Sequence, residues 1–174
     1  MTSARLGLAE WTVLAVAGER PVHGFAIAAL TAADGHLGRV WQIPRPVVYR
    51  AIGRLVDAGL ITAEAVETGG GPPRTLYTST DAGREHLQAW LAAPVPHVRD
   101  LRSEFLLKLA LLHRRGADPA PLVAAQRREL EPIVDALRSE QDGVERGGAD
   151  DFDRMLIAWR RVSAEAALAF LDEM

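Results

Sequence analysis

The stretch Ile43–Ile61 constrains the fold of this chain more than any other. Pro44 and Pro46 fit the first turn of a helix, where a missing backbone N–H costs little. Gly59 is a residue type that commonly follows a helix end, so we predict a helix that runs on from the prolines to about Ala58. Apolar residues recur at helical spacing along one side of it: Val48, Ile52, Leu55, Val56 and Leu60.

The opposite side of this helix is cationic. Its residues are Val47, Arg50, Ala51 and Arg54. No acidic residue lies between Asp34 and Asp57. A helix that is buried on one side and cationic on the other is typical of helices that enter the major groove of DNA. The alternative is a solvent-exposed cationic face with no partner.

Composition restricts the other options. The 174 residues suffice for one domain or two small ones, and 48% hydrophobic residues suffice for a core. The net charge of −3 gives no whole-chain argument for nucleic acid, so any such argument must be local. There is no cysteine, hence no disulfide or thiolate metal site, and we see neither a signal peptide nor a membrane span. We therefore expect a soluble, cytoplasmic protein.

The first half of the chain predicts a winged helix-turn-helix. We expect helices over Leu6–Ala17, which includes Trp11, and over 23–33, with Phe25, Ile27 and Leu30 as packing residues. After the central helix, 61–68 and 74–78 alternate in polarity around a Gly/Pro-rich tip, which predicts a β-hairpin. Thr80 and Asp81 then cap a helix over 82–92. In this plan the third helix enters the major groove and the hairpin contacts the adjacent backbone.

The second half is predicted to be helical. We expect residues 1–92 to form the DNA-binding domain, 93–97 a hinge and 98–174 a helical dimerisation domain, so the fold class is mainly α with a small β-hairpin. The helix over 99–115 should bury Leu101, Phe105, Leu109 and Leu112. The helix over 150–173 has apolar residues at alternating steps of three and four, which predicts a coiled-coil-like dimer seam. The residues of this seam are Phe152, Met155, Trp159 and Val162.

Five further residues are candidate DNA contacts beside Arg50 and Arg54. Arg45 lies at the helix N-terminus, where the helix dipole also attracts phosphate. Tyr49 could place its hydroxyl on a phosphate, and Val47 could pack on a thymine methyl or have no role. At the hairpin tip, Arg74 could reach phosphate or the minor groove, and Gly70 would allow close approach of the backbone.

Two tryptophans raise the question of a small-molecule site. Trp90 lies beside the predicted hinge and Trp159 lies on the seam, and aromatic side chains at a subunit junction can line a pocket for an aromatic effector. The alternative is that both belong to the dimer core. The histidines form no metal-binding pair and no catalytic constellation stands out, so we predict no metal, no cofactor and no enzymatic activity.

Several short motifs, taken together, resemble the PadR family of bacterial transcriptional regulators. They are His23-Gly24-Phe25, Val48-Tyr49-Arg50, Arg54-Leu55, Gly59-Leu60-Ile61, Arg74 with Tyr77, Thr80–Arg84 and Glu104–Leu109. The resemblance covers residues 6–112 well. Two features depart from the family pattern: Phe25 stands where a tyrosine is usual, and Pro44-Arg45-Pro46-Val47 replaces a start with small or hydroxyl residues.

The resemblance implies a dimeric repressor that a small molecule, such as a phenolic acid or a drug, releases from DNA. We therefore predict a homodimeric, sequence-specific repressor that reads an inverted-repeat operator on double-stranded DNA. The alternative is a winged-helix protein-interaction module that does not bind specific DNA.

Overall fold

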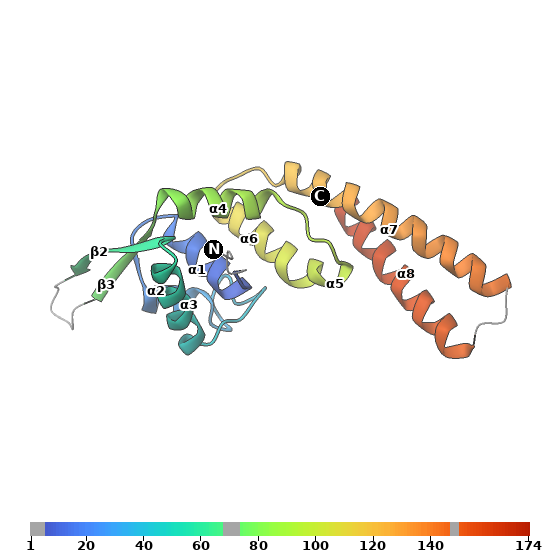
Figure 1. Cartoon of the computed structure of the whole chain (residues 1–174), viewed down its shortest axis with the longest axis horizontal. Coiled ribbons are helices and arrows are strands. Elements are labelled where there is room, and N and C mark those ends of the chain that lie inside the picture. The colour runs from blue at the N-terminus through green and yellow to red at the C-terminus, as the bar shows by residue number, and fades with distance from the viewer. Residues whose placement is uncertain (1–5, 68–73, 147–149) are drawn as a thin grey trace. The chain divides into compact units, whose positions relative to one another are not determined.

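The computed structural model describes residues 6–67, 74–146 and 150–174, and leaves the side chains of 65–67, 74, 145 and 146 undescribed. The chain divides into two compact units. The first combines residues up to Leu91 with Leu107–Ala117, and the second combines Ala92–Leu106 with Asp118–Met174. The two units are described in turn (Figure 1).

The helices of the first unit follow the sequence prediction closely. They are α1 (Leu8–Ala17), α2 (Gly24–Leu30), α3 (Arg45–Asp57), α4 (Asp81–Ala92) and most of α6 (Leu106–Arg114). Helix α3 begins directly after Pro44 and stops at Ala58, and the next residue, Gly59, has φ 67°. Thr80 caps α4, because its hydroxyl accepts the Gly83 N–H at 3.0 Å.

The predicted hairpin is one side of a small antiparallel sheet. It consists of β2 (Ile61–Glu67) and β3 (Arg74–Ser79), paired from Ile61 with Ser79 to Glu67 with Arg74. A third strand, β1 (Val22–His23), pairs with β3, so the order is β1-β3-β2. The sequence analysis missed β1, because two residues are too few to show an alternating pattern. The predicted fold class, a winged helix-turn-helix followed by a helical region, is confirmed.

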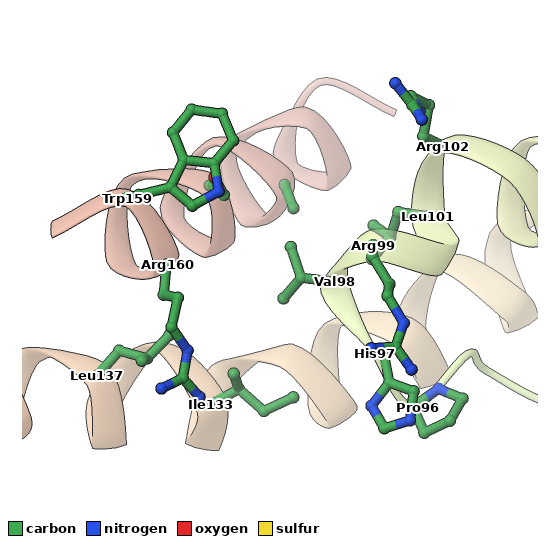
Figure 2. A pocket seen from close by; sticks show the side chains of 12 residues that line it. Pro96, His97, Val98, Arg99, Leu101, Arg102, Ile133, Leu137, Trp159 and Arg160 are labelled. Carbon is green, nitrogen blue, oxygen red and sulfur yellow. The ribbon is translucent and has the colours of Figure 1, made fainter. Parts of the chain in front are cut away.

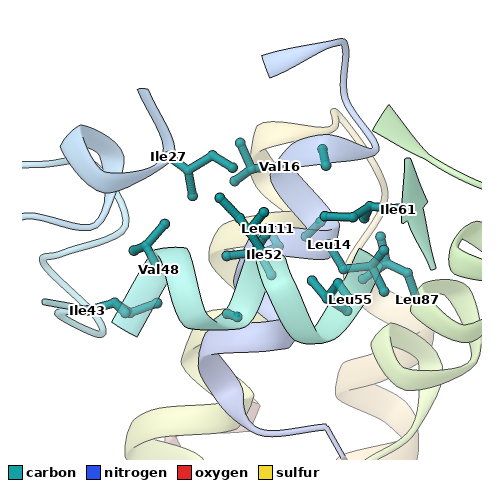
Figure 3. Packing of buried hydrophobic residues seen from close by; sticks show 14 of the residues in the cluster. Leu14, Val16, Ile27, Ile43, Val48, Ile52, Leu55, Ile61, Leu87 and Leu111 are labelled. Carbon is teal, nitrogen blue, oxygen red and sulfur yellow. The ribbon is translucent and has the colours of Figure 1, made fainter. Parts of the chain in front are cut away.

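One hydrophobic core holds the first unit together (Figure 3). Leu14 and Val16 of α1 pack with Ile27 of α2, with the inner face of α3 and with Leu87 of α4. Leu107 and Leu111 of α6 join this core, although they lie far along the sequence. Residues 107–117 thus belong to the first unit, although the segment just before them belongs to the second. The predicted domain boundaries, 1–92, 93–97 and 98–174, stay a prediction.

The second unit is built on two long helices. They are α7 (Ala120–Arg146) and α8 (Asp151–Asp172), preceded by α5 (Val98–Asp100) and the π-helical turn η1 (Leu101–Phe105). Val134 and Leu137 of α7 pack against Ala164 of α8. Helix α7 includes Pro132 and continues through it. Asp118 and Asp150 accept backbone N–H groups at the two helix starts, at 3.0 and 2.8 Å.

A charged cluster links α7 and α8. The Glu165 carboxylate accepts a hydrogen bond from Arg138 Nε at 2.8 Å and also pairs with Arg161. The hydrogen bond from Arg138, aided by the charges of Arg161 and Arg138, lowers the pKa of Glu165 below its usual value. Glu165 therefore stays ionised at neutral pH and contributes to holding the two helices side by side.

The first segment of the second unit is hydrogen-bonded to α7. Gln126 is fully buried, and its amide makes two hydrogen bonds with the backbone of Val95. The Val95 N–H donates to Gln126 Oε1 at 2.7 Å, and Gln126 Nε2 donates to the Val95 carbonyl at 2.9 Å. One side chain thus satisfies both backbone groups of a buried residue in the predicted hinge.

The predicted packing is wrong at five residues. In α3, Ala51 is buried and Val56 is exposed, because α1 packs against the side that carries Ala51 and the buried stripe is rotated toward it. Phe25, predicted to pack, is 54% exposed. Along 99–115, the first part buries Leu101 and Phe105, and the second part buries Leu107, Lys108 and Leu111. Leu109 and Leu112 are only half-buried. The two parts of this segment belong to different units, and a π-helical turn lies before the change.

Candidate nucleic-acid interface

The exposed side of α3 is the centre of the candidate interface. Arg45, Tyr49, Arg50 and Arg54 are exposed, while Val48, Ile52 and Leu55 anchor the helix in the core. The first turn carries no acidic residue and no side-chain cap, so the positive end of the helix dipole is not neutralised locally. The predicted separation into a buried face and a cationic face is present, and Val47 is half-buried against the core.

Two aromatic rings flank Arg45 at the start of α3. Its guanidinium lies 5.4 Å from the ring centre of Phe25 and 5.7 Å from that of Tyr49. These are cation–π distances, and both rings are partly exposed. The Tyr49 ring also packs on α2, because a Cβ on Gly24 would lie 2.9 Å from Tyr49 Cε1. Arg45 is therefore held beside the helix N-terminus, where a phosphate would be attracted.

Arg54 makes an ion pair within the protein. Its Nη1 donates to Glu10 Oε1 at 3.0 Å, and the other oxygen, Oε2, accepts the N–H of Gly7 at 3.0 Å. The Glu10 side chain is 10% exposed, whereas that of Arg54 is 73% exposed. The stretch 35–56 holds no acidic residue, but in the fold α1 brings the Glu10 carboxylate to Arg54.

A groove of about 390 Å³ runs beside this ion pair. It is lined from α1 and the turn before it by Gly7 and Glu10, from the loop before α3 by Trp41, and from α3 by Arg50 and Arg54 among others. Both exposed arginines of the C-terminal part of α3 therefore border the same depression. Contact of Arg45, Val47, Tyr49, Arg50 and Arg54 with DNA stays a prediction.

The predicted wing contacts are Gly70 and Arg74. Gly70 falls outside the described residues. Arg74 is the first residue of β3, where its Cα pairs with that of Glu67. The structure therefore gives the position of Arg74 along the hairpin, and its DNA contact stays a prediction.

The predicted dimer seam forms an exposed apolar stripe on α8. The exposed fractions are 63% for Phe152, 63% for Met155, 71% for Trp159 and 51% for Val162. The other face of the same helix buries Ile157, Ala164 and Leu171. The helix is thus apolar on two sides, and only one of them is covered within the second unit.

A groove of about 790 Å³ lies within the second unit (Figure 2). Trp159 and Arg160 of α8, Ile133 and Leu137 of α7, and His97 and Arg99 near α5 line it, as Figure 2 shows. Its walls combine apolar side chains with cationic ones and include no acidic residue. An anionic ligand with an apolar body would match this lining.

The second tryptophan of the predicted effector site has a different environment. Trp90 stacks on Trp11 within the first unit, with ring centres 4.9 Å apart and an angle of 8° between the rings. The ammonium of Lys108, which is buried, lies 4.7 Å from the Trp90 ring centre. Trp90 does not line the groove that contains Trp159. Their shared role in effector binding stays a prediction.

The sequence analysis missed Glu10, Phe25 and Gly53 as parts of this surface. A signal for Glu10 was present, since it is the only charged residue in the apolar segment Leu6–Ala17. Phe25 gave none, because its exposure depends on how α2 packs. Gly53 lies on the exposed side of α3, and a Cβ there would meet no atom within 4 Å. No packing reason for a glycine exists at that position.

Clusters of metal-ligating side chains and membrane-spanning helices are both absent from the described residues. Within 6–67, 74–146 and 150–174, no group of three or more His, Cys, Asp or Glu side chains could hold a metal ion. In the same part of the chain, no helix combines the length and apolar character needed to cross a bilayer.

Comparison with known proteins supports the interpretation of the first unit. The negative transcriptional regulator PadR of Bacillus subtilis (strain 168) is 32% identical over 72 residues, which span 41% of this chain and 40% of that protein. The crystal structure of Bacillus subtilis PadR in complex with operator DNA shares the fold, with a TM-score of 0.50 at 19% identity over 97% of this chain and 98% of that chain. Residues 13–89 match the model of the Transcriptional regulator PadR-like family. The resemblance seen in the sequence is thereby confirmed: this stretch, which contains α2, α3 and the hairpin and makes up less than half of the chain, is similar to the PadR-like family of transcriptional regulators.

Proposed function

We propose that this regulator is a homodimeric repressor that binds an inverted-repeat operator through α3 and the β2–β3 hairpin. The observation that carries the proposal is the division of α3 into a buried face and an exposed face with Arg45, Tyr49 and Arg50. Arg50 would read a base edge, with guanine the favoured partner. Arg45 would bind phosphate at the helix N-terminus.

The hairpin would contact the DNA backbone next to the major groove. Arg74 begins β3 at the tip end of the hairpin, and Gly70 lies in the glycine-rich tip sequence. Phosphate contacts of this kind fix the orientation of a protein on the duplex and carry no base information. Arg74 would therefore contribute equally to all sequences.

Dimerisation would use the exposed stripe of α8. Phe152, Met155, Trp159 and Val162 form an apolar surface that a second copy of the same helix would cover. A symmetric dimer places two α3 helices about a two-fold axis, which is why an inverted repeat with half-sites one or two DNA turns apart is expected. An apolar stripe flanked by polar residues is a surface that a soluble dimer buries.

A small aromatic effector is proposed to release the repressor. The groove that includes Trp159 supports this, because its lining combines an indole ring with Arg99, Arg102 and Arg160. An anionic aromatic compound bound there would favour one arrangement of the second unit, and any arrangement that spaces the α3 helices wrongly would lose operator affinity.

A protein-interaction module without specific DNA binding is the second candidate. The first 92 residues hold equal numbers of basic and acidic side chains, so their net charge alone does not favour DNA. The exposed arginines of α3 would then meet an acidic protein surface. This candidate and the repressor differ in one measurable property, the preference for one duplex over another.

The test is a binding titration with two duplexes. Fluorescence anisotropy is measured with an inverted repeat from upstream of the chain's own coding region, and with a shuffled duplex of equal composition. We expect the inverted repeat to bind at least about a thousandfold more tightly at physiological salt. Arg50→Ala is expected to weaken operator binding by roughly 1–3 kcal/mol and to relax preference at one base pair, while the hairpin variant Arg74→Ala weakens binding to both duplexes alike.

Equal affinity for the two duplexes would contradict the repressor and favour the interaction module. An Arg50→Ala protein with unchanged affinity and preference would show that the reading face of α3 is assigned wrongly. Circular dichroism of each variant provides the control for folding.

A further inference from the structure

We propose that Glu10 holds Arg54 away from DNA phosphates and thereby limits the part of the affinity that is independent of base sequence. The inference rests on the proposed DNA-binding function of α3. It makes Glu10 a positioning residue, since it acts on DNA through the arginine that it binds. It also limits Arg54 as a predicted DNA contact, because the ion pair with Glu10 holds the arginine within the protein.

The geometry gives each carboxylate oxygen of Glu10 one partner. Oε2 accepts the Gly7 N–H at 3.0 Å, which closes the first turn of α1, and Oε1 accepts Arg54 Nη1 at 3.0 Å. The carboxylate is thus fixed by the helix that carries it. Because the Glu10 side chain is almost fully buried, it cannot turn outward to follow Arg54.

The arginine is the exposed partner of this pair. Its side chain is largely exposed, and it lies at the edge of the exposed face of α3, next to buried Leu55. Arg50, one turn earlier, makes no hydrogen bond or ion pair among the contacts recorded for the described residues. The two arginines on this side of α3 are therefore in different states: Arg54 is neutralised by a buried carboxylate and Arg50 is not.

This difference changes what each arginine offers to DNA. Non-specific affinity comes from cations that neutralise phosphates and release counterions, and each such contact adds to the salt dependence. An arginine already paired with a carboxylate brings no net charge to the duplex. Glu10 also borders the same groove as Arg50 and Arg54, so a phosphate that approached Arg54 there would meet a negative charge.

The variant Glu10→Gln separates the charge of Glu10 from its structural role. A glutamine at the third position of a helix can still accept the N–H that Gly7 donates, as in a capping box. It cannot form an ion pair with Arg54. The substitution should therefore leave α1 intact and release the arginine.

The experiment compares wild type, Glu10→Gln, Arg54→Ala and the double variant on a shuffled duplex between 50 and 200 mM salt. Glu10→Gln is expected to bind more tightly at low salt, with a slope of log K against log salt steeper by about 0.9, which corresponds to one added phosphate contact. Its affinity would then fall roughly 3.5-fold more across this range than that of wild type. Arg54→Ala should leave the wild-type slope unchanged and should restore that slope in the Glu10→Gln protein.

Glu85→Gln is the matched control, because it removes the same charge from an exposed position on α4. Its slope should equal that of wild type. The inference is overturned if Glu10→Gln leaves the slope unchanged, if Glu85→Gln steepens it equally, or if Arg54→Ala alone reduces the wild-type slope by about one contact. If wild type binds neither this duplex nor the operator, the proposed function itself fails, and the inference with it.

Discussion

Among single residues, Gly53 is a glycine inside a helix that packing does not explain. A glycine inside a helix costs up to about 1 kcal/mol relative to alanine, because the unfolded chain has more freedom to lose. Gly53 lies on the exposed side of α3 with open space around it, so the cost is not offset by packing. On α3 as the proposed reading helix, the missing side chain would allow the backbone to approach the duplex closely.

Gly53→Ala is therefore expected to raise the free energy of unfolding by about 0.5–1 kcal/mol, measured by urea denaturation, and to weaken operator binding. The added methyl group would stabilise the helix and would meet the DNA. Gly143→Ala in α7 is the matched control, since its Cβ also meets no atom within 4 Å. It should stabilise the protein without changing operator affinity. Tighter operator binding by Gly53→Ala would contradict this view of the reading face.

At the scale of elements, the sequence predicts helices well where their signals are local. The prolines and Gly59 around α3, the Thr80 cap of α4 and the Asp118 and Asp150 starts of α7 and α8 all act within a few residues. They could be read without knowledge of the fold. The boundaries of α3, α4 and α8 accordingly match the prediction to within a residue or two.

Features that depend on distant partners could not be read in this way. Strand β1 exists only because β3 lies beside it, and Ala51 is buried only because α1 packs on that side of α3. The pairing of Arg54 with Glu10 joins residues 44 positions apart. The sequence thus predicts the exposed arginines of the candidate interface. It does not predict that the Glu10 carboxylate pairs with one of them, Arg54.

The two hydrogen bonds between Gln126 and the Val95 backbone give a prediction at the scale of elements. Gln126→Leu keeps a buried side chain of similar size but leaves the N–H and the carbonyl of Val95 without partners. We expect a loss of about 2 kcal/mol or more in the free energy of unfolding, because each unpaired buried group costs about 1–3 kcal/mol. Urea denaturation measures the loss, and hydrogen exchange at the Val95 amide locates it.

Arg128→Leu, at an exposed position of the same helix, is the control for added apolar character on α7. It should change the unfolding free energy little. If the Val95 amide exchanged as slowly in Gln126→Leu as in wild type, its hydrogen bond to Gln126 would not be what protects it from exchange.

At the scale of the whole molecule, recognition and assembly would occupy separate parts of the chain. The family match ends at residue 89, within α4, and the exposed apolar stripe begins at Phe152 on α8. A single copy leaves that stripe open to water, which disfavours the monomer. Operator affinity should therefore depend on residues that never contact DNA.

Trp159→Ala is expected to shift the protein from dimer toward monomer in sedimentation velocity, since it removes the most exposed large side chain among the four residues of the predicted seam. Trp41→Ala is the matched control, because Trp41 is a partly exposed tryptophan of the first unit. It should sediment as wild type does. If Trp159→Ala sedimented as wild type does, the stripe would not be the dimer seam.

The stacked pair Trp11–Trp90 has an optical consequence. Two indole rings that are nearly parallel and 4.9 Å apart couple their electronic transitions. The pair should therefore produce an exciton signal in circular dichroism that reports on the packing of α1 against α4. Trp159 is exposed on α8 and should contribute mainly a solvent-sensitive emission. Trp41 of the first unit is also partly exposed and adds to that emission, so the exciton signal, unlike the emission, reports on one unit without any added label.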